Sequence, residues 1–147
     1  MRITIFGANG KVGTLVTKHA LEKGYTVKAF VHGSTPFSDH PKLTITQGDI
    51  YDPKAVELAA EGSDAIVSTL GSWGTPKKDI VSTGAKHIIS AMKKGGVHRV
   101  ITLTGADAEA AGDHHGFVHV VSRPFIKILA GKILADGEKH IALLEQS

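Results

Sequence analysis

Three glycines, at positions 7, 10 and 13, form the pattern in this chain with the clearest chemical use. They follow a short apolar run at residues 3–6 and open a segment with helical spacing of apolar side chains. Glycines in such a turn allow tight dihedral angles and let a pyrophosphate approach the backbone, while free amides at the helix start face the phosphates. The pattern therefore predicts a dinucleotide-binding turn rather than a purely structural one. We expect its contacts from Gly7, Asn9, Gly10, Lys11, Val12 and Gly13.

The segment after the second predicted strand bears on which dinucleotide binds. A site for NAD places an acidic residue about 20 residues after the glycines, on the ribose hydroxyl. Here the chain reads His32, Gly33, Ser34 and Thr35, with no carboxylate to repel a 2′-phosphate. The sequence therefore favours NADP over NAD, with hydrogen bonds to the phosphate from His32, Ser34 and Thr35. The alternative is that these residues form an ordinary turn.

Short apolar segments alternate with amphipathic ones along the whole chain, which is typical of a parallel α/β sheet. We predict one Rossmann-like domain over residues 1–147, with strand order 3-2-1-4-5 and helices on both faces. In such sheets a ligand binds beyond the carboxyl ends of the strands, where the strand order reverses. Asp52 and Pro53 can cap and open one helix. We expect strands at residues 3–6, 26–31, 43–46, 65–70 and 99–103. We expect a first helix from the spacing of residues 12–20, with a stop at Gly24, a second that opens at Asp52-Pro53, a third at 80–94, and a final helix that follows an apolar run after Pro124 and extends to about residue 145.

Composition narrows the class of protein. Cysteine is absent, which excludes disulfides and thiolate chemistry and fits a cytoplasmic location. No apolar run approaches about 18 residues, so we expect no membrane partner. The net charge is +3, and no cluster of lysine and arginine stands out, so we expect no nucleic-acid partner.

Several segments resemble the NmrA-like atypical short-chain dehydrogenase/reductase family, which includes the flavin reductase and biliverdin-IX-beta reductase type. The resemblance covers essentially the whole chain, and the glycine turn is its most specific part. It is carried by residues 7–13, by Val31-His32, by Gly48-Asp49-Ile50, by Leu70-Gly71 and by the runs 131–136 and 143–147.

The resemblance implies a role for further residues. Residues 9–12 would contact the pyrophosphate, and His32 stands where the family commonly has an arginine for the 2′-phosphate. Asp49 and Ile50 would lie beside the adenine, although Asp49 also suits a turn or helix start. Leu70 and Gly71 would lie near the ribose and the pyrophosphate.

Two departures from the family pattern concern catalysis. The Tyr-x-x-x-Lys dyad is absent, because the two tyrosines, Tyr25 and Tyr51, both precede the fifth strand. At the end of that strand only Thr104 offers a hydroxyl near the nicotinamide, and the alternative is a plain strand-end residue. Relatives continue beyond Ser147, so we expect the substrate-covering region to be missing and the fifth strand to be free to pair in a homodimer.

Other polar clusters carry weaker signals. His114, His115 and His119 with Asp113 could group around a metal, but a solvated loop explains them better, and we predict no metal site. Polar residues near the C-terminus are expected on a solvated helix face, with Asp136 facing the pocket as the alternative. They are Asp136, Glu138, Lys139 and His140.

The function that these features favour is an NAD(P)H-dependent oxidoreductase acting on a small planar acceptor of the flavin or quinone type. A solvent proton would suffice for such an acceptor, which suits the missing tyrosine. The alternative is a dinucleotide-sensing NmrA-like regulator without turnover. A third hypothesis, a sugar-nucleotide epimerase or dehydratase, fits less well because that chemistry uses the tyrosine.

Overall fold

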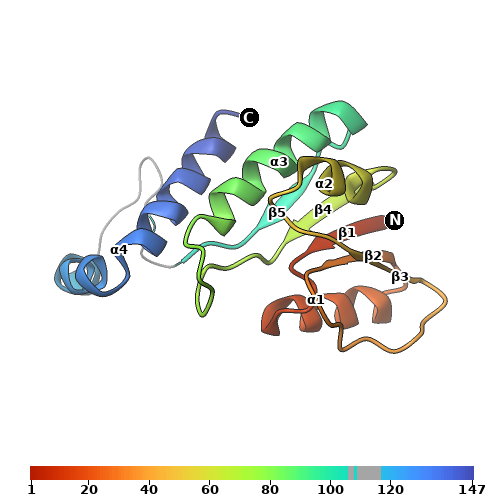
Figure 1. Ribbon diagram of the computed structural model, residues 1–147, viewed down its shortest axis with the longest axis horizontal. Helices are drawn as coiled ribbons and strands as arrows, with labels where there is room; N and C mark the ends of the chain where they lie inside the picture. Colours follow the sequence, from red (N-terminus) through yellow and green to blue (C-terminus); the bar gives the residue numbers. More distant parts are fainter. Residues whose placement is uncertain (106–107, 109–116) are drawn as a thin grey trace. The chain divides into compact units, whose positions relative to one another are not determined.

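The five predicted strands form one parallel sheet in the computed structural model, in the predicted order β3-β2-β1-β4-β5 (Figure 1). The register places Ile5 of β1 beside Ala29 of β2 on one side and Val67 of β4 on the other. The strand order reverses between β1 and β4, so the predicted binding edge is at the carboxyl ends of these two strands. The strands are β1 (Arg2–Phe6), β2 (Thr26–Val31), β3 (Leu43–Gln47), β4 (Ala65–Ser68) and β5 (Val100–Thr102).

The structure describes residues 1–105, 108 and 117–147, without the side chains of residues 117–123, 125 and 126. These residues divide into two compact units. The first unit comprises residues 1–70 and 87–103 and holds the sheet, and the second comprises residues 71–86 and 104–147. The expectation of one domain over residues 1–147 stays a prediction.

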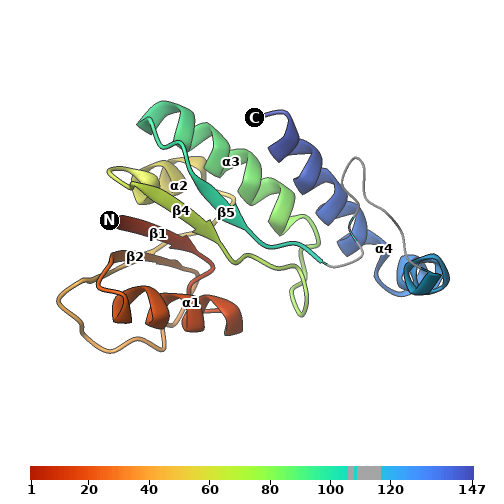
Figure 2. The same cartoon turned by 180° about the vertical axis from the view of Figure 1, so that it is seen from behind.

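Helices cover both faces of the sheet, as the sequence predicts. The helix α1 (Lys11–Glu22) lies on one face (Figures 1 and 2). The other face carries α2 (Pro53–Ala60) and the part of α3 (Ile80–Gly95) that belongs to the first unit. One apolar cluster of this unit is built from residues of β1, β2 and α1, among them Ile5, Val27 and Ala20.

Local signals set most of the element ends. The side chain of Asp52 accepts a hydrogen bond from the Lys54 amide at 2.9 Å, so it caps α2 as predicted, with Pro53 in the first turn. Gly24 has a φ of +82° and follows the end of α1, a conformation that favours glycine. The strand β4 ends at Ser68, two residues before the predicted end.

The second unit contains the helix α4 (Phe117–Glu145), which is interrupted by a non-helical residue at Ala130. The predicted solvated face of this helix is wrong for two residues, because Asp136 is 5% exposed and His140 is 2% exposed. Lys139 is exposed, as expected. Burial lowers the pKa of the His140 imidazole, and the negative charge of Asp136 opposes that shift.

Asp136 is buried because it accepts three hydrogen bonds within the second unit. Its carboxylate lies 2.8 Å from the Ser72 hydroxyl, 3.0 Å from the Val81 amide and 2.9 Å from the Ser82 amide. The two amides belong to the first turn of α3, where a negative charge also interacts favourably with the helix dipole. One carboxylate therefore fixes both the start of α3 and the segment that precedes it.

Replacing Asp136 by alanine is expected to lower the free energy of unfolding by about 2 kcal/mol, because three donors lose their acceptor. The loss should appear first as faster amide hydrogen exchange at Val81 and Ser82, measured by NMR. The control is Lys139→Ala, on the exposed side of the same helix. Equal exchange rates in Asp136→Ala and Lys139→Ala would contradict the capping role.

Candidate functional site

The glycine turn predicted from the sequence leaves the end of β1 and enters α1 within the first unit. Gly7 has a φ of +75°, and the Gly10 amide donates to its carbonyl at 3.0 Å. A Cβ at Gly7 would lie 3.2 Å from the backbone of Thr69 and Leu70, so Gly7 serves both the turn and the close packing. Gly13 serves packing, because its Cβ would lie 2.1 Å from the Gly7 carbonyl oxygen.

Gly10 differs from these two glycines. Its φ of −71° and ψ of 167° are open to any residue, and a Cβ there would meet only one atom, the Gly7 carbonyl oxygen at 3.3 Å. The backbone angles therefore do not require a glycine here, although the 3.3 Å contact with a backbone oxygen is tight for a Cβ. Contact of Gly10 with a pyrophosphate stays a prediction.

The start of α1 suits an anion. Gly10 is the N-cap residue, no side chain caps the helix, and the first turn contains no acidic residue. Lys11 and Val12 are exposed at this end. Amides at an uncapped helix N-terminus, together with the helix dipole, attract phosphate groups.

The loop after β2 is tied to the glycine turn by Asn9. The side-chain amide of Asn9 donates to the carbonyls of His32 at 2.9 Å and Ser34 at 3.0 Å. Both of its side-chain protons are thereby used within the protein. The structure thus brings together Asn9, His32 and Ser34, and the side chains of the last two are exposed. The hydroxyl of Thr35 instead accepts a bond from the Phe37 amide at 3.3 Å.

Thr69 is a positioning residue that the sequence interpretation missed. Its hydroxyl lies 3.0 Å from the carbonyl oxygen of Phe6 and 3.1 Å from that of Gly7, and donates to both. The Thr69 amide also donates to the Phe6 carbonyl at 2.9 Å, so Thr69 holds the end of β4 against the start of the glycine turn. A threonine directly after an apolar strand, opposite a glycine turn, was the available signal.

Asp49 and Ile50 follow the end of β3. The Asp49 carboxylate accepts a bond from the Tyr51 amide at 3.0 Å, the turn arrangement that the sequence also allowed. The carbonyl of buried Ile50 is 2.8 Å from His87 Nδ1 on α3. The preceding Gly48 is required for packing, because a Cβ there would lie 2.6 Å from the ring of Phe30. Contact of Asp49 and Ile50 with adenine stays a prediction.

Gly71 and Thr104, which the sequence also predicts in the site, belong to the second unit. Leu70 is the last residue of the segment 1–70 in the first unit. Gly71 is exposed, and a Cβ there would meet no atom within 4 Å. Thr104 is exposed, with its hydroxyl 3.0 Å from the position of a Cβ on Gly137. Thr104 therefore lies beside α4, and its role toward a nicotinamide stays a prediction.

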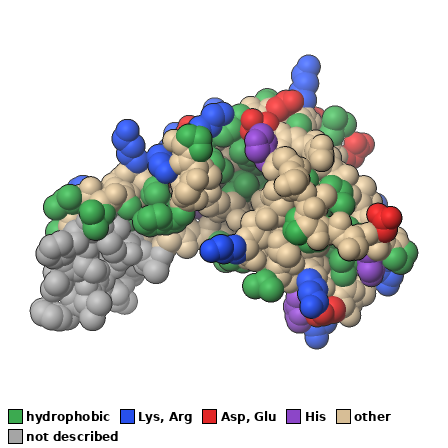
Figure 3. Space-filling view, turned by 60° about the horizontal axis from the view of Figure 1, so that its bottom comes forward, with side chains coloured by type: hydrophobic (Ala, Val, Ile, Leu, Met, Phe, Trp, Pro, Cys, Tyr) green, Lys and Arg blue, Asp and Glu red, His purple; other side chains and the backbone are tan. Residues whose placement is uncertain are grey.

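The described residues contain no group of three or more metal-ligating side chains. The candidates Asp113, His114 and His115 lie outside the described residues, as does the side chain of His119. Among the described helices, none is both long and apolar enough to cross a membrane. On the face shown in Figure 3, lysine and arginine side chains are scattered and form no continuous stripe.

Residues 7–147 match a protein-family model described as NAD(P)H-binding. Among curated proteins, a 3-beta-hydroxysteroid dehydrogenase from Mycolicibacterium neoaurum is 29% identical over 112 residues, which cover 68% of this chain and 31% of that protein. The chain spans about a third of the length of the curated relatives that it matches first.

Solved structures share the fold over nearly the whole chain. A short-chain dehydrogenase/reductase from Veillonella parvula DSM 2008, in complex with NADP, has a TM-score of 0.78 and 17% identity, and the match covers 99% of this chain and 64% of that one. ChuY, an anaerobillin reductase from Escherichia coli O157:H7, has a TM-score of 0.73 and 21% identity, with 100% and 68% covered. At these identities the likeness concerns the fold alone.

Proposed function

Because this chain belongs to the NAD(P)H-binding family, as its resemblance to NmrA-like proteins predicted, we propose that it is an oxidoreductase that uses NADPH to reduce a small planar acceptor of the flavin or quinone type. The observation that carries the nucleotide part is the start of α1 at Gly10, which no side chain caps and which the first turn leaves without an acidic residue. The proposal concerns this chain, which matches only part of its longer relatives.

Each part of the site has a role in this proposal. The backbone at Gly10 and the first amides of α1 hold the pyrophosphate, and the exposed side chains of His32 and Ser34 hold the 2′-phosphate. The reduced nicotinamide supplies a hydride. Thr104 orients either the nicotinamide or the acceptor through its hydroxyl.

The choice of acceptor follows from the missing acid. The chain has no Tyr-x-x-x-Lys dyad to protonate a carbonyl oxygen, whereas a reduced flavin or quinone takes its proton from water. One structural neighbour, ChuY, is described as an anaerobillin reductase, and the acceptor class proposed here is compatible with that fold.

Steady-state oxidation of NADPH, followed by the loss of nicotinamide absorbance, tests the proposal with a panel of flavins and quinones. Turnover that requires an acceptor supports it. Tight NADPH binding without turnover of any acceptor supports the second candidate, a dinucleotide-sensing regulator, which the single hydroxyl at Thr104-Gly105 favours. Epimerase activity on a sugar nucleotide remains the third and weakest hypothesis.

Replacing His32 by aspartate is expected to shift the preference from NADP toward NAD by about tenfold or more. The new carboxylate repels a 2′-phosphate and offers an acceptor to the ribose hydroxyl. Isothermal titration of both nucleotides into both chains measures the shift. The control is His40→Asp, an exposed histidine on the loop between β2 and β3. Tighter binding of NAD than NADP by the unaltered chain would contradict the proposed preference.

Two further properties complete the proposal. The strand β5 lies at one edge of the described sheet, and Ile101 on it is 49% exposed, which supports pairing of two copies. The absence of cysteine supports a cytoplasmic location.

A further inference from the structure

The segment between β4 and α3, residues 71–79, contains the single tryptophan of the chain. The side chain of Trp73 is 75% exposed, whereas its neighbour Ser72 is 1% exposed. A lone exposed apolar side chain is common on protein surfaces and by itself indicates nothing. The structure of residues 71–79 distinguishes Trp73 from such a side chain.

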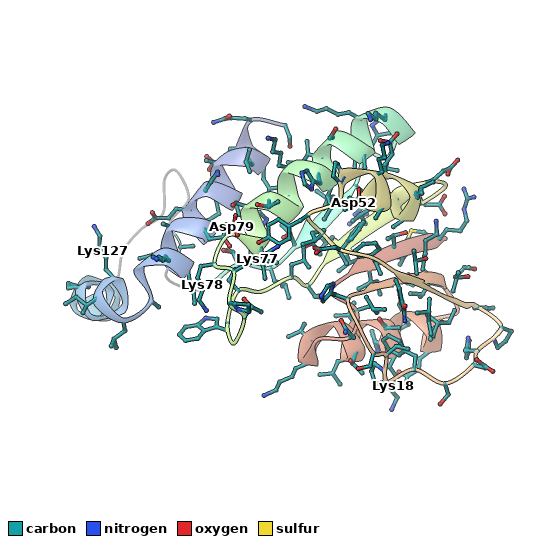
Figure 4. All side chains as sticks on the ribbon, in the orientation of Figure 1. Lys18, Asp52, Lys77, Lys78, Asp79 and Lys127 are labelled. Carbon is teal, nitrogen blue, oxygen red and sulfur yellow. The ribbon has the colours of Figure 1, made fainter. Side chains whose placement is uncertain are left out.

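The backbone that carries Trp73 is firmly anchored. The Ser72 hydroxyl donates to the buried carboxylate of Asp136 at 2.8 Å. The Ser72 carbonyl, on the other side of the residue, is 2.9 Å from the Thr75 hydroxyl and 3.4 Å from Lys78 Nζ. Lys78 and its neighbour Lys77 lie on this segment, directly before Asp79 and the start of α3 (Figure 4). The indole therefore projects from an ordered backbone. Little conformational entropy of this backbone is lost when a ligand binds to the indole.

Two glycines flank the Ser72-Trp73 pair. Gly71 precedes the pair and Gly74 follows it, and a Cβ at either glycine would meet no atom within 4 Å. Gly74 also has a φ of +72°, which keeps this position a glycine. Neither flanking residue therefore carries a side chain that could cover the exposed indole.

Covalent connection keeps Trp73 near the end of β4. Trp73 follows Leu70 by three residues, so their Cα atoms are no more than about 11 Å apart in any arrangement of the chain. The Leu70 amide itself is 3.2 Å from the position of a Cβ on Gly7 of the glycine turn. Trp73 therefore stays within about 11 Å of a residue that packs on the glycine turn, whatever the arrangement of the two units.

From these observations we infer that Trp73 is a specificity-determining residue that stacks on the ring of the planar acceptor, an inference that rests on the proposed function. An indole presents a large, flat, electron-rich face, and an oxidised flavin ring is flat and electron-poor, so offset stacking is favourable. Stacking also tolerates variation in ring substituents, because every flat aromatic ring offers a face. Trp73 thereby selects flat acceptors over saturated carbonyl compounds.

Intrinsic fluorescence gives a direct test, because the emission of the chain at tryptophan wavelengths comes from Trp73 alone. Riboflavin is titrated into the chain saturated with NADP⁺, so that no hydride is transferred. Quenching of Trp73 emission that saturates, beyond that of free N-acetyltryptophanamide, is the expected result. The fluorescence of riboflavin itself measures its affinity for variants that lack the indole.

Replacing Trp73 by alanine is expected to weaken riboflavin binding and raise its KM about tenfold, with a smaller effect on kcat and with NADPH affinity within twofold of the unaltered chain. Trp73→Phe should restore most of the affinity, which separates stacking from misfolding. The matched control is Leu58→Ala, a side chain on α2 that is 66% exposed.

The outcomes separate the two proposals. Equal riboflavin affinity in Trp73→Ala, Leu58→Ala and the unaltered chain overturns the role of Trp73 and leaves the proposed function standing. If the unaltered chain neither binds riboflavin nor oxidises NADPH with any flavin or quinone, the proposed function and this inference are both overturned.

Discussion

A chain with alanine at position 13 is expected to lose about 4 kcal/mol or more of folding free energy. The added Cβ would lie 2.1 Å from the Gly7 carbonyl oxygen and 2.8 Å from both the Ala8 Cα and the Thr69 hydroxyl oxygen. Two of these three atoms belong to the backbone, so α1 must move away from the sheet to admit one methyl group. Urea denaturation, followed by circular dichroism, measures the loss.

The control for this prediction is Gly10→Ala in the same turn. Its methyl group meets only the Gly7 carbonyl oxygen at 3.3 Å, so its free energy of unfolding should stay within about 1 kcal/mol of the unaltered chain. A Gly13→Ala chain as stable as Gly10→Ala would show that α1 does not pack on the glycine turn as closely as described.

Replacing Gly10 by valine is expected to weaken NADP(H) binding at least 100-fold, about 2.7 kcal/mol, while the chain remains folded. The backbone angles of Gly10 accept a valine, so the branched side chain projects where the pyrophosphate must approach the main chain. Isothermal titration gives the affinity, and the urea midpoint confirms the fold.

Gly95→Val supplies the matched control. This glycine is the last residue of α3, and a Cβ there would meet only the Val97 side chain at 3.9 Å. The control variant should bind NADP(H) like the unaltered chain. Undiminished affinity for NADP(H) in a folded Gly10→Val chain would show that the glycine turn is not part of the nucleotide site.

The sheet and the glycine turn were predictable because their signals are local. The run at residues 3–6, the three glycines and the Asp52-Pro53 cap each lie within one element and its turn. Strand order followed from the right-handed crossover of parallel strands, which few topologies satisfy. The sequence treats the three glycines alike, and only the structure separates Gly10 from Gly7 and Gly13.

The remaining features depend on partners far away in the sequence. Nothing local distinguishes Asp136 from its helix neighbours, because the donors that bury it come from Ser72 and the start of α3. Likewise the carbonyls that Asn9 engages lie beyond β2, so the sequence did not predict that its side chain holds this loop. Periodicity identifies a polar helix position but not the buried donor that faces it.

The bond between Ser72 and Asp136 joins residues 64 positions apart, which gives it a consequence during translation. At about 5–20 residues per second, a ribosome adds Asp136 some 3–13 s after Ser72. Four of the five strands precede Ser72 and β5 is added within that interval, so the sheet can assemble before the carboxylate exists. The segment that bears Trp73 is then the late-ordering part of the nascent polypeptide, and a chain arrested before residue 136 would expose it to proteases while its sheet is already protected.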